Sequence, residues 1–146
     1  MCSNALTRPS RFGDWLGKEV VSVDAERRTV EVRYQPREDA TNRYGTLAGG
    51  ALAAMLDSLT GLAALAVLPE ETVAVHRALA VDYLRPAAPG PIRGVGRVLE
   101  QDERVIACEG DLFDADGQLV ARGRAQLRVV RGSTASTRPE TTGESP

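Results

Sequence analysis

Asp57 stands alone in a run of residues, 47–68, that is otherwise almost entirely apolar or small, LAGGALAAMLDSLTGLAALAVL. A run of this length and composition predicts a helix, and Pro69 ends it because proline cannot continue the helical hydrogen bonds. A carboxylate in the middle of a buried helix is costly unless another group compensates for its burial. We therefore expect a core helix that carries a functional acid.

The same run is long enough to raise the possibility of a membrane span. Asp57 and the glycine and hydroxyl residues within the run favour a core helix instead. The first residues lack the basic-then-apolar order of a secretory signal, because Arg8, Arg11 and Asp14 interrupt it. We therefore expect a cytoplasmic protein that does not associate with membranes.

Composition excludes several classes of function. The 146 residues suit one domain with a real core, and a net charge of −2 offers no general attraction to nucleic acid. Two cysteines, Cys2 and Cys108, do not make a disulfide framework, and a single histidine makes a conventional zinc site very improbable. Neither a metal nor a redox cofactor is predicted.

The two faces of the predicted helix differ in side-chain size. A bulky apolar stripe at three-and-four spacing suits packing on a sheet. It consists of Leu52, Leu56, Leu59 and Ala63, flanked by Met55, Leu62 and Ala66. The opposite face consists of Gly50, Ala53, Ala54, Asp57, Gly61 and Ala64. Because this second face is small except for the acid, we expect it to admit a ligand or a second subunit close to the backbone.

The segments around the helix predict strands. Residues 20–23 and 29–34 precede it, and residues 72–84, 91–101, 104–114 and 119–130 follow it, with clear period-two alternation in the last run. Short connections between the last four runs predict an antiparallel meander. Residues 1–16 are expected to form a loose lead-in with a short helix near 11–16, residues 17–131 the domain, and residues 132–146 a disordered tail.

Two strands, one long apolar helix and four more strands predict an α+β architecture in which an antiparallel sheet curls around a central helix. This arrangement matches the hotdog fold. Specific motifs add to the match over residues 40–130. They are the loop Asn42-x-x-Gly45-Thr46-Leu47-x-Gly49-Gly50, then Asp57, then Asp82-Tyr83-Leu84-Arg85-Pro86-Ala87 and Gly90. Together they resemble the phenylacetate-pathway (PaaI-like) hotdog acyl-CoA thioesterases.

The resemblance implies hydrolysis of an acyl- or aryl-CoA thioester to free acid and CoA. It implies that the backbone N–H of Gly49 and the side-chain amide of Asn42 stabilise the oxyanion. It implies that Asp57 acts as a general base on water or attacks the thioester directly, and the sequence leaves both mechanisms open. His76 occupies the position at which a serine or threonine commonly places the water in this family.

The same interpretation puts Gly50, Ala48, Thr60 and Gly61 against the substrate. Two positions depart from the family: Ala48 stands where the loop usually has histidine, and His76 replaces the usual hydroxyl residue. Because Ala48 leaves the backbone amide of Gly49 in place, this departure puts rate and substrate range in question rather than the oxyanion site itself.

The resemblance also implies that the active sites lie between subunits of a homodimer or a dimer-of-dimers tetramer. Each site would combine Asn42 and Gly49 of one chain with Asp57 of another. An unpaired edge strand and the small helix face are independent reasons to expect self-association.

Structural interpretations stay open for each of these residues. Asp57 could pair with an amide or an arginine, the paired glycines could serve close packing, Asn42 could form an Asx turn, and His76 could be an ordinary strand residue. Arginines could bind CoA phosphates or form a solvated strand face; the candidates are Arg77, Arg85, Arg93, Arg122 and Arg124. Alternative functions are a non-catalytic binder of acyl-CoA or acyl-carrier protein and, less favoured, a hotdog dehydratase.

Overall fold

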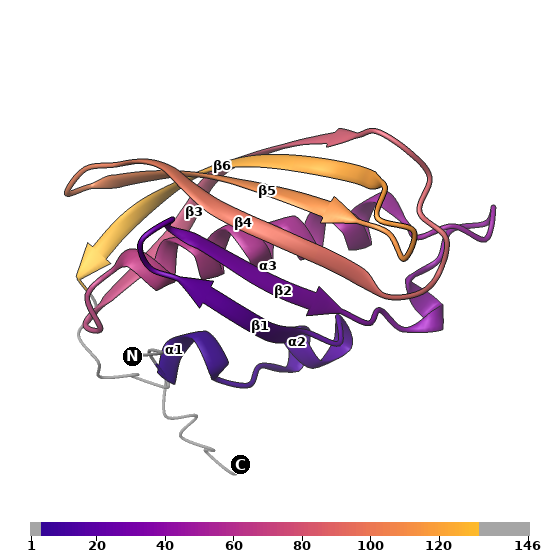
Figure 1. Ribbon diagram of the computed structural model, residues 1–146, viewed down its shortest axis with the longest axis horizontal. Helices are drawn as coiled ribbons and strands as arrows, with labels where there is room; N and C mark the ends of the chain where they lie inside the picture. Colours follow the sequence, from indigo (N-terminus) through magenta and orange to yellow (C-terminus); the bar gives the residue numbers. More distant parts are fainter. Residues whose placement is uncertain (1–3, 132–146) are drawn as a thin grey trace, which may run out of the picture.

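A six-stranded antiparallel sheet curves around one long helix, α3 (Figure 1). The computed structural model describes residues 4–131. The strands are β1 (Glu19–Asp24), β2 (Thr29–Tyr34), β3 (Thr72–Tyr83), β4 (Ile92–Gln101), β5 (Val105–Phe113) and β6 (Leu119–Arg131). The helices are α1 (Asn4–Thr7), α2 (Arg11–Trp15) and α3 (Gly49–Val67), with a single 3-10 turn at Glu38–Ala40. The predicted α+β hotdog architecture is confirmed, and the predicted tail, 132–146, lies outside the described residues.

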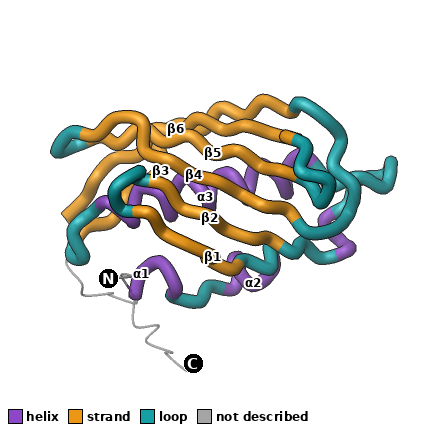
Figure 2. The backbone as a smooth tube through the Cα atoms, in the orientation of Figure 1, coloured by secondary structure: helices purple, strands orange, loops and turns teal. Residues whose placement is uncertain are grey.

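The strand order is β1-β2-β4-β5-β6-β3, so β1 and β3 form the two edges. The meander predicted over four strands is therefore wrong in part, because only β4, β5 and β6 follow one another in space. Residues 84–91 carry the chain from β3 at one edge to β4 beside β2 (Figure 2). The prolines Pro86, Pro89 and Pro91 in this connection do not suit a tight hairpin, which leaves β3 free to pair with β6.

The bulky stripe of α3 lies against the sheet as predicted. Leu52, Met55, Leu56 and Leu59 are buried. The small face is less covered, although Ala64, which the sequence pattern placed there, is buried as well. By length and apolar composition α3 also passes as a membrane span. Its contacts with five strands identify it as the core helix of this fold.

Glycines on the inner face of the sheet let α3 approach the strands closely. A Cβ atom at Gly96 would lie 3.0 Å from the carbonyl oxygen of Leu59, and one at Gly110 would lie 2.9 Å from the Leu59 side chain. Gly94 and Gly123 face Leu59 and Leu56 in the same way. The glycines of three adjacent strands therefore set how deeply the helix lies in the sheet.

The N-terminal segment is more ordered than the expected loose lead-in. The predicted short helix is present as α2, and the Ser10 hydroxyl caps it by accepting a hydrogen bond from the Gly13 N–H at 2.9 Å. Helix α1 was not predicted. Leu6 and Leu16 are buried in the main core, so this segment packs onto the sheet and α3.

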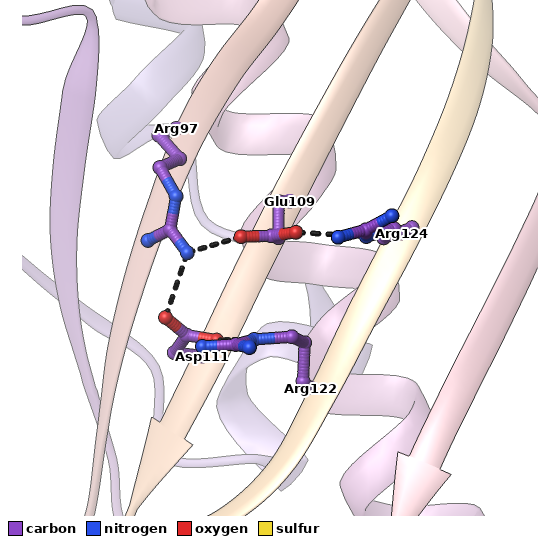
Figure 3. A network of polar contacts seen from close by, with 5 residues as sticks. All are labelled: Arg97, Glu109, Asp111, Arg122 and Arg124. Carbon is purple, nitrogen blue, oxygen red and sulfur yellow. Dashed lines mark hydrogen bonds and ion pairs between the residues drawn. The ribbon is translucent and has the colours of Figure 1, made fainter.

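The outer face of the sheet carries a cross-strand ion network (Figure 3). Glu109 and Asp111 on β5 bind Arg97 on β4 and two arginines of β6, Arg122 and Arg124. Because side chains alternate along a strand, the network lies opposite the glycines that face the helix. The arginines leave both carboxylates less than a tenth exposed, so these acids are paired although they point away from the core.

Candidate active site

Asp57 and His76 form a pair between α3 and β3. The Nδ1 atom of His76 lies 3.3 Å from Oδ1 of Asp57. The Asp57 side chain is 52% exposed and that of His76 is 23% exposed, so the acid lies at an open surface of the protomer. The expectation that Asp57 is buried is thus wrong for the single chain, and the cost of burying its charge does not arise there.

A β-bulge directly follows His76 in β3. The pairing of β3 with β6 shifts in register between His76 and Ala78, and His76 lies opposite Leu127, which is buried. Bulges of this kind change the direction of a side chain and are common beside active sites. His76 keeps the inward alternation of Thr72 and Ala74, and the bulge shifts this alternation for the residues that follow, so that Leu79 and Val81 are again the less exposed ones.

Thr60 and Gly61 complete the surroundings of the imidazole. Thr60 is fully buried, and its Oγ1 atom lies 2.8 Å from Nε2 of His76. A Cβ atom at Gly61 would lie 3.3 Å from Cε1 of His76, which is closer than ordinary packing. Thr60 therefore contacts the site through His76, while Gly61 leaves room for the ring to lie against the helix.

Tyr34 fixes the turn of α3 that carries the acid. Its hydroxyl lies 3.2 Å from the carbonyl oxygen of Met55 and 3.1 Å from the hydroxyl of Ser58. Burial raises the pKa of Tyr34 far above its ordinary value, so the group stays a neutral hydroxyl. The Met55 backbone and the Ser58 side chain, on either side of Asp57 along the helix, are thereby tied to β2.

The start of α3 provides a second functional region. Within the described residues, Ala48 gives the first turn no side-chain cap, which leaves the N–H groups of Gly49 and Gly50 available to a ligand. A Cβ atom at Gly50 would meet open space, whereas one at Gly49 would lie 3.3 Å from the ring of Tyr83. The Tyr83 hydroxyl donates a hydrogen bond to the carbonyl oxygen of Gly49 at 2.9 Å.

Asn42 faces the same region and also shapes its own loop. Its Oδ1 atom accepts hydrogen bonds from the N–H groups of Tyr44 at 2.9 Å and Thr46 at 3.2 Å, which is the Asx turn considered as an alternative. Its Nδ2 atom donates to the Thr46 hydroxyl at 2.8 Å. An amide carries two hydrogens, so one remains for a ligand.

These residues line two separate grooves of the protomer. One, of about 380 Å³, contains Asp57 and Gly61 and runs between α3 and the N-terminal segment. The other, of about 360 Å³, contains Asn42, Gly49 and Tyr83. Asp57 follows Gly49 by eight positions in one helix, which separates the two residues by about 12 Å at the helical rise per residue.

The remaining candidates lie elsewhere or are engaged in other contacts. Arg93 pairs with Glu31, while Arg122 and Arg124 belong to the network of the outer face. Arg85 lines the Gly49 groove and donates a hydrogen bond to Gln118 at 3.0 Å. A larger cavity of about 910 Å³ lies at the far end of α3 and contains none of the predicted site residues.

Sequence reasoning missed Tyr83 as a member of the site, and it proposed Arg85 only as one of five arginines that could bind CoA phosphates. Both belong to the element 82–87 on which the family resemblance rests, so the signal was present in the sequence. The missing information was the approach of the end of β3 to the start of α3, which depends on β3 lying at the sheet edge beside β6.

Comparisons with known proteins agree with this geometry. Residues 44–121 match the Thioesterase superfamily. Human acyl-coenzyme A thioesterase 13 is 31% identical over 122 residues, which cover 82% of this chain and 86% of the human protein. The structure of a phenylacetic acid degradation-related protein of Ralstonia eutropha aligns with a TM-score of 0.81 and 31% identity, over 86% of this chain and 97% of that one. The E. coli PaaI protein, 20% identical, shares the fold with a TM-score of 0.78 over 88% of this chain and 91% of its own.

Proposed function

Because the chain belongs to the thioesterase superfamily, we propose that it hydrolyses an acyl- or aryl-CoA thioester to the free acid and CoA. The observation that carries the proposal is the division of reactive groups along α3. Gly49 with its open N–H groups stands at the start of the helix, and Asp57 with His76 stands about 12 Å further along.

The chemistry needs both regions at one carbonyl group. The N–H of Gly49 and the free amide hydrogen of Asn42 bind the carbonyl oxygen, whose negative charge grows as the carbon becomes tetrahedral. Asp57 takes a proton from the attacking water or attacks the carbon itself. Both groups must lie within contact distance of the same few atoms, which is impossible across about 12 Å of one helix.

Two copies of the chain resolve this mismatch. The exposed edge of β3 and the small face of α3 both suit a second copy, and exposed apolar residues such as Val73, Val75 and Leu84 gather at that edge. In an isologous homodimer, each site takes Asn42 and Gly49 from one chain and Asp57 from its partner. A pair of such dimers would give a tetramer with the same sites.

Complementation between two inactive variants tests both the activity and the shared site. Thiol release from short, medium and aryl CoA thioesters is measured for Asn42→Asp, for Asp57→Asn and for the two variants refolded together. Random mixing gives half heterodimers, each with one intact site of its two, so activity returns to roughly a quarter of the wild-type value. Activity that stays at the level of the separate variants would place all groups in one chain and overturn the shared site.

A non-catalytic binder of the same esters is the second candidate, and Ala48 favours it. Ala48, at the N-cap of α3, stands where PaaI-like thioesterases usually carry a histidine. Without that side chain, the contacts by which it would orient the loop before α3 are missing. Tight binding of a CoA thioester by the wild-type protein without any thiol release would select this function over hydrolysis.

A further inference from the structure

The hydroxyl of Thr60 has more neighbours than hydrogens. Its Oγ1 atom lies 2.7 Å from the carbonyl oxygen of Leu56, 3.3 Å from that of Asp57 and 2.8 Å from Nε2 of His76. A threonine hydroxyl donates one hydrogen and accepts through its lone pairs. Donation to the carbonyl four residues earlier is the usual arrangement for a threonine inside a helix, and the contact with Leu56 is the shortest of the three.

The single hydroxyl hydrogen of Thr60 then determines the tautomer of the His76 imidazole. With its hydrogen on the Leu56 carbonyl, Oγ1 can only accept from His76, so Nε2 must carry a hydrogen. In the neutral ring Nδ1 is consequently bare, and it faces Oδ1 of Asp57 at 3.3 Å. Two acceptors meet there, and the contact becomes a hydrogen bond only when a proton enters it.

We propose that Thr60 is a positioning residue that fixes the tautomer of His76, so that Nδ1 is the nitrogen that takes up and releases a proton beside Asp57. Thr60 has no exposed surface, and we assign it no contact with substrate. The inference rests on the proposed thioesterase function only for its chemical consequence, because the tautomer is a property of the resting protein.

In hydrolysis, this arrangement gives the proton a defined route. Asp57 accepts a proton from the attacking water, the water oxygen bonds to the carbonyl carbon, and the C=O electron pair moves to the carbonyl oxygen. The proton passes from Asp57 to Nδ1, and the imidazolium delivers it to sulfur as the C=O bond re-forms and the C–S bond breaks. If Asp57 attacks instead, the C–S bond breaks as the mixed anhydride forms and CoA leaves as the thiolate. Water then attacks the acyl carbon, Nδ1 takes its proton, and the bond from that carbon to Asp57 breaks to release the free acid and the Asp57 carboxylate.

The chain has one histidine, which makes the tautomer directly measurable. In protein labelled with ¹³C and ¹⁵N at histidine, couplings within the ring report which nitrogen carries hydrogen, at a pH where titration shows the ring to be neutral. We expect hydrogen on Nε2 in the wild type and in Thr60→Ser. In Thr60→Val, which keeps the side-chain shape but loses the acceptor, we expect the hydrogen to move to Nδ1, where Asp57 accepts it.

Activity supplies the second measurement. Thr60→Val should lower kcat by about tenfold with KM nearly unchanged, which is less than the loss of an acid–base group itself, and Thr60→Ser should restore most of it. Thr72→Val is the matched control, because the Thr72 hydroxyl also binds a backbone carbonyl but lies exposed at the start of β3.

A neutral wild-type ring with its hydrogen on Nδ1 would overturn the inference, as would a Thr60→Val variant with an unchanged tautomer. If Thr60→Val fails to fold, the spectra of the wild type and Thr60→Ser still decide, since each must show hydrogen on Nε2. Absence of thioesterase activity would refute the proposed function alone and leave the tautomer test intact.

Discussion

The imidazole of His76 reaches Asp57 from the edge strand of the sheet, with Nδ1 3.3 Å from Oδ1. The two residues meet because β3 pairs with β6 and the alternation along β3 turns His76 toward α3. Because we propose that the proton of the attacking water passes from Asp57 to His76, both groups should be needed for turnover. Substitutions at Asp57, beside His76 and at the other end of α3 should therefore each change the rate of thiol release.

Replacement of Asp57 by asparagine should abolish most of the activity. The variant keeps the size and shape of the side chain but loses the proton acceptor, so kcat for thiol release should fall by at least about a hundredfold. Because Asp57 is half exposed, the free energy of unfolding should change little. Asp39→Asn, at an exposed acid near Arg37, serves as the control. Equal turnover in wild type and Asp57→Asn would make this acid structural.

Replacement of Gly61 by alanine should lower activity without lowering stability. Alanine is favoured over glycine in a helix by up to about 1 kcal/mol, so Gly61→Ala should hold or raise the free energy of unfolding. Its Cβ would crowd Cε1 of His76 at 3.3 Å and displace the ring, so kcat should fall. Gly50→Ala, where the added atom meets open space, is the comparison in urea unfolding. Unchanged kcat in Gly61→Ala would show that the ring position does not limit the reaction.

At the start of α3, an exchange of amide for carboxylate tests the oxyanion site. Asn42→Asp keeps an acceptor for the Asx turn with Tyr44 and Thr46 but removes the amide hydrogens. It also puts negative charge where the carbonyl oxygen gains charge, so kcat should fall by on the order of a hundredfold or more. Thermal unfolding should show an intact fold. Full activity in this variant would leave Asn42 with its loop role only.

The ion network predicts how stability depends on pH. Burial would raise the pKa of Asp111, but hydrogen bonds from Arg122 and Arg97 outweigh it and hold that pKa below its ordinary value. Glu109, bound by Arg97 and Arg124, behaves in the same way. A carboxylate with a lowered folded-state pKa adds stability above its unfolded-state pKa and loses it as pH falls through the folded-state pKa.

Asp111→Asn should therefore lower the free energy of unfolding at neutral pH by about 1–3 kcal/mol. Urea unfolding at stepped pH should show the gap between wild type and variant closing as pH falls from about 4, the ordinary pKa of an aspartate, through the lowered pKa of Asp111 in the folded protein. Asp116→Asn, in the exposed turn after β5, is the control. A gap that stays constant as pH falls through that acid range would contradict a charged role for Asp111.

Local sequence patterns predicted much of the fold. Period-two alternation predicted β6 with its buried and exposed faces, and Thr29–Tyr34 appears with the predicted bounds. The stripe of leucines in α3 predicted which face meets the sheet, because helical spacing alone determines it. The position of β3 was not predictable in this way, since pairing with β6 depends on the path of residues 84–91 in space.

The predicted site residues form two separate groups in the structure. Asp57 and His76 come together within one chain, whereas Asn42 and Gly49 lie with Tyr83 at the other end of the helix. A motif read along the sequence does not distinguish groups of one chain from groups of a partner. Asp57 is half exposed in the single chain, so the expectation that its position in an apolar helix buries it was wrong there.

The glycines beneath α3 make the site sensitive to positions that have no reactive group. A side chain at Gly96 would press on the backbone oxygen of Leu59, so the turn of α3 that also carries Asp57 would have to move away from the sheet. We therefore expect the rate of hydrolysis to depend on these glycines as well as on the reacting groups. Random mutagenesis should find slow variants at the strand glycines. There a larger residue displaces the helix although no reacting group has been changed.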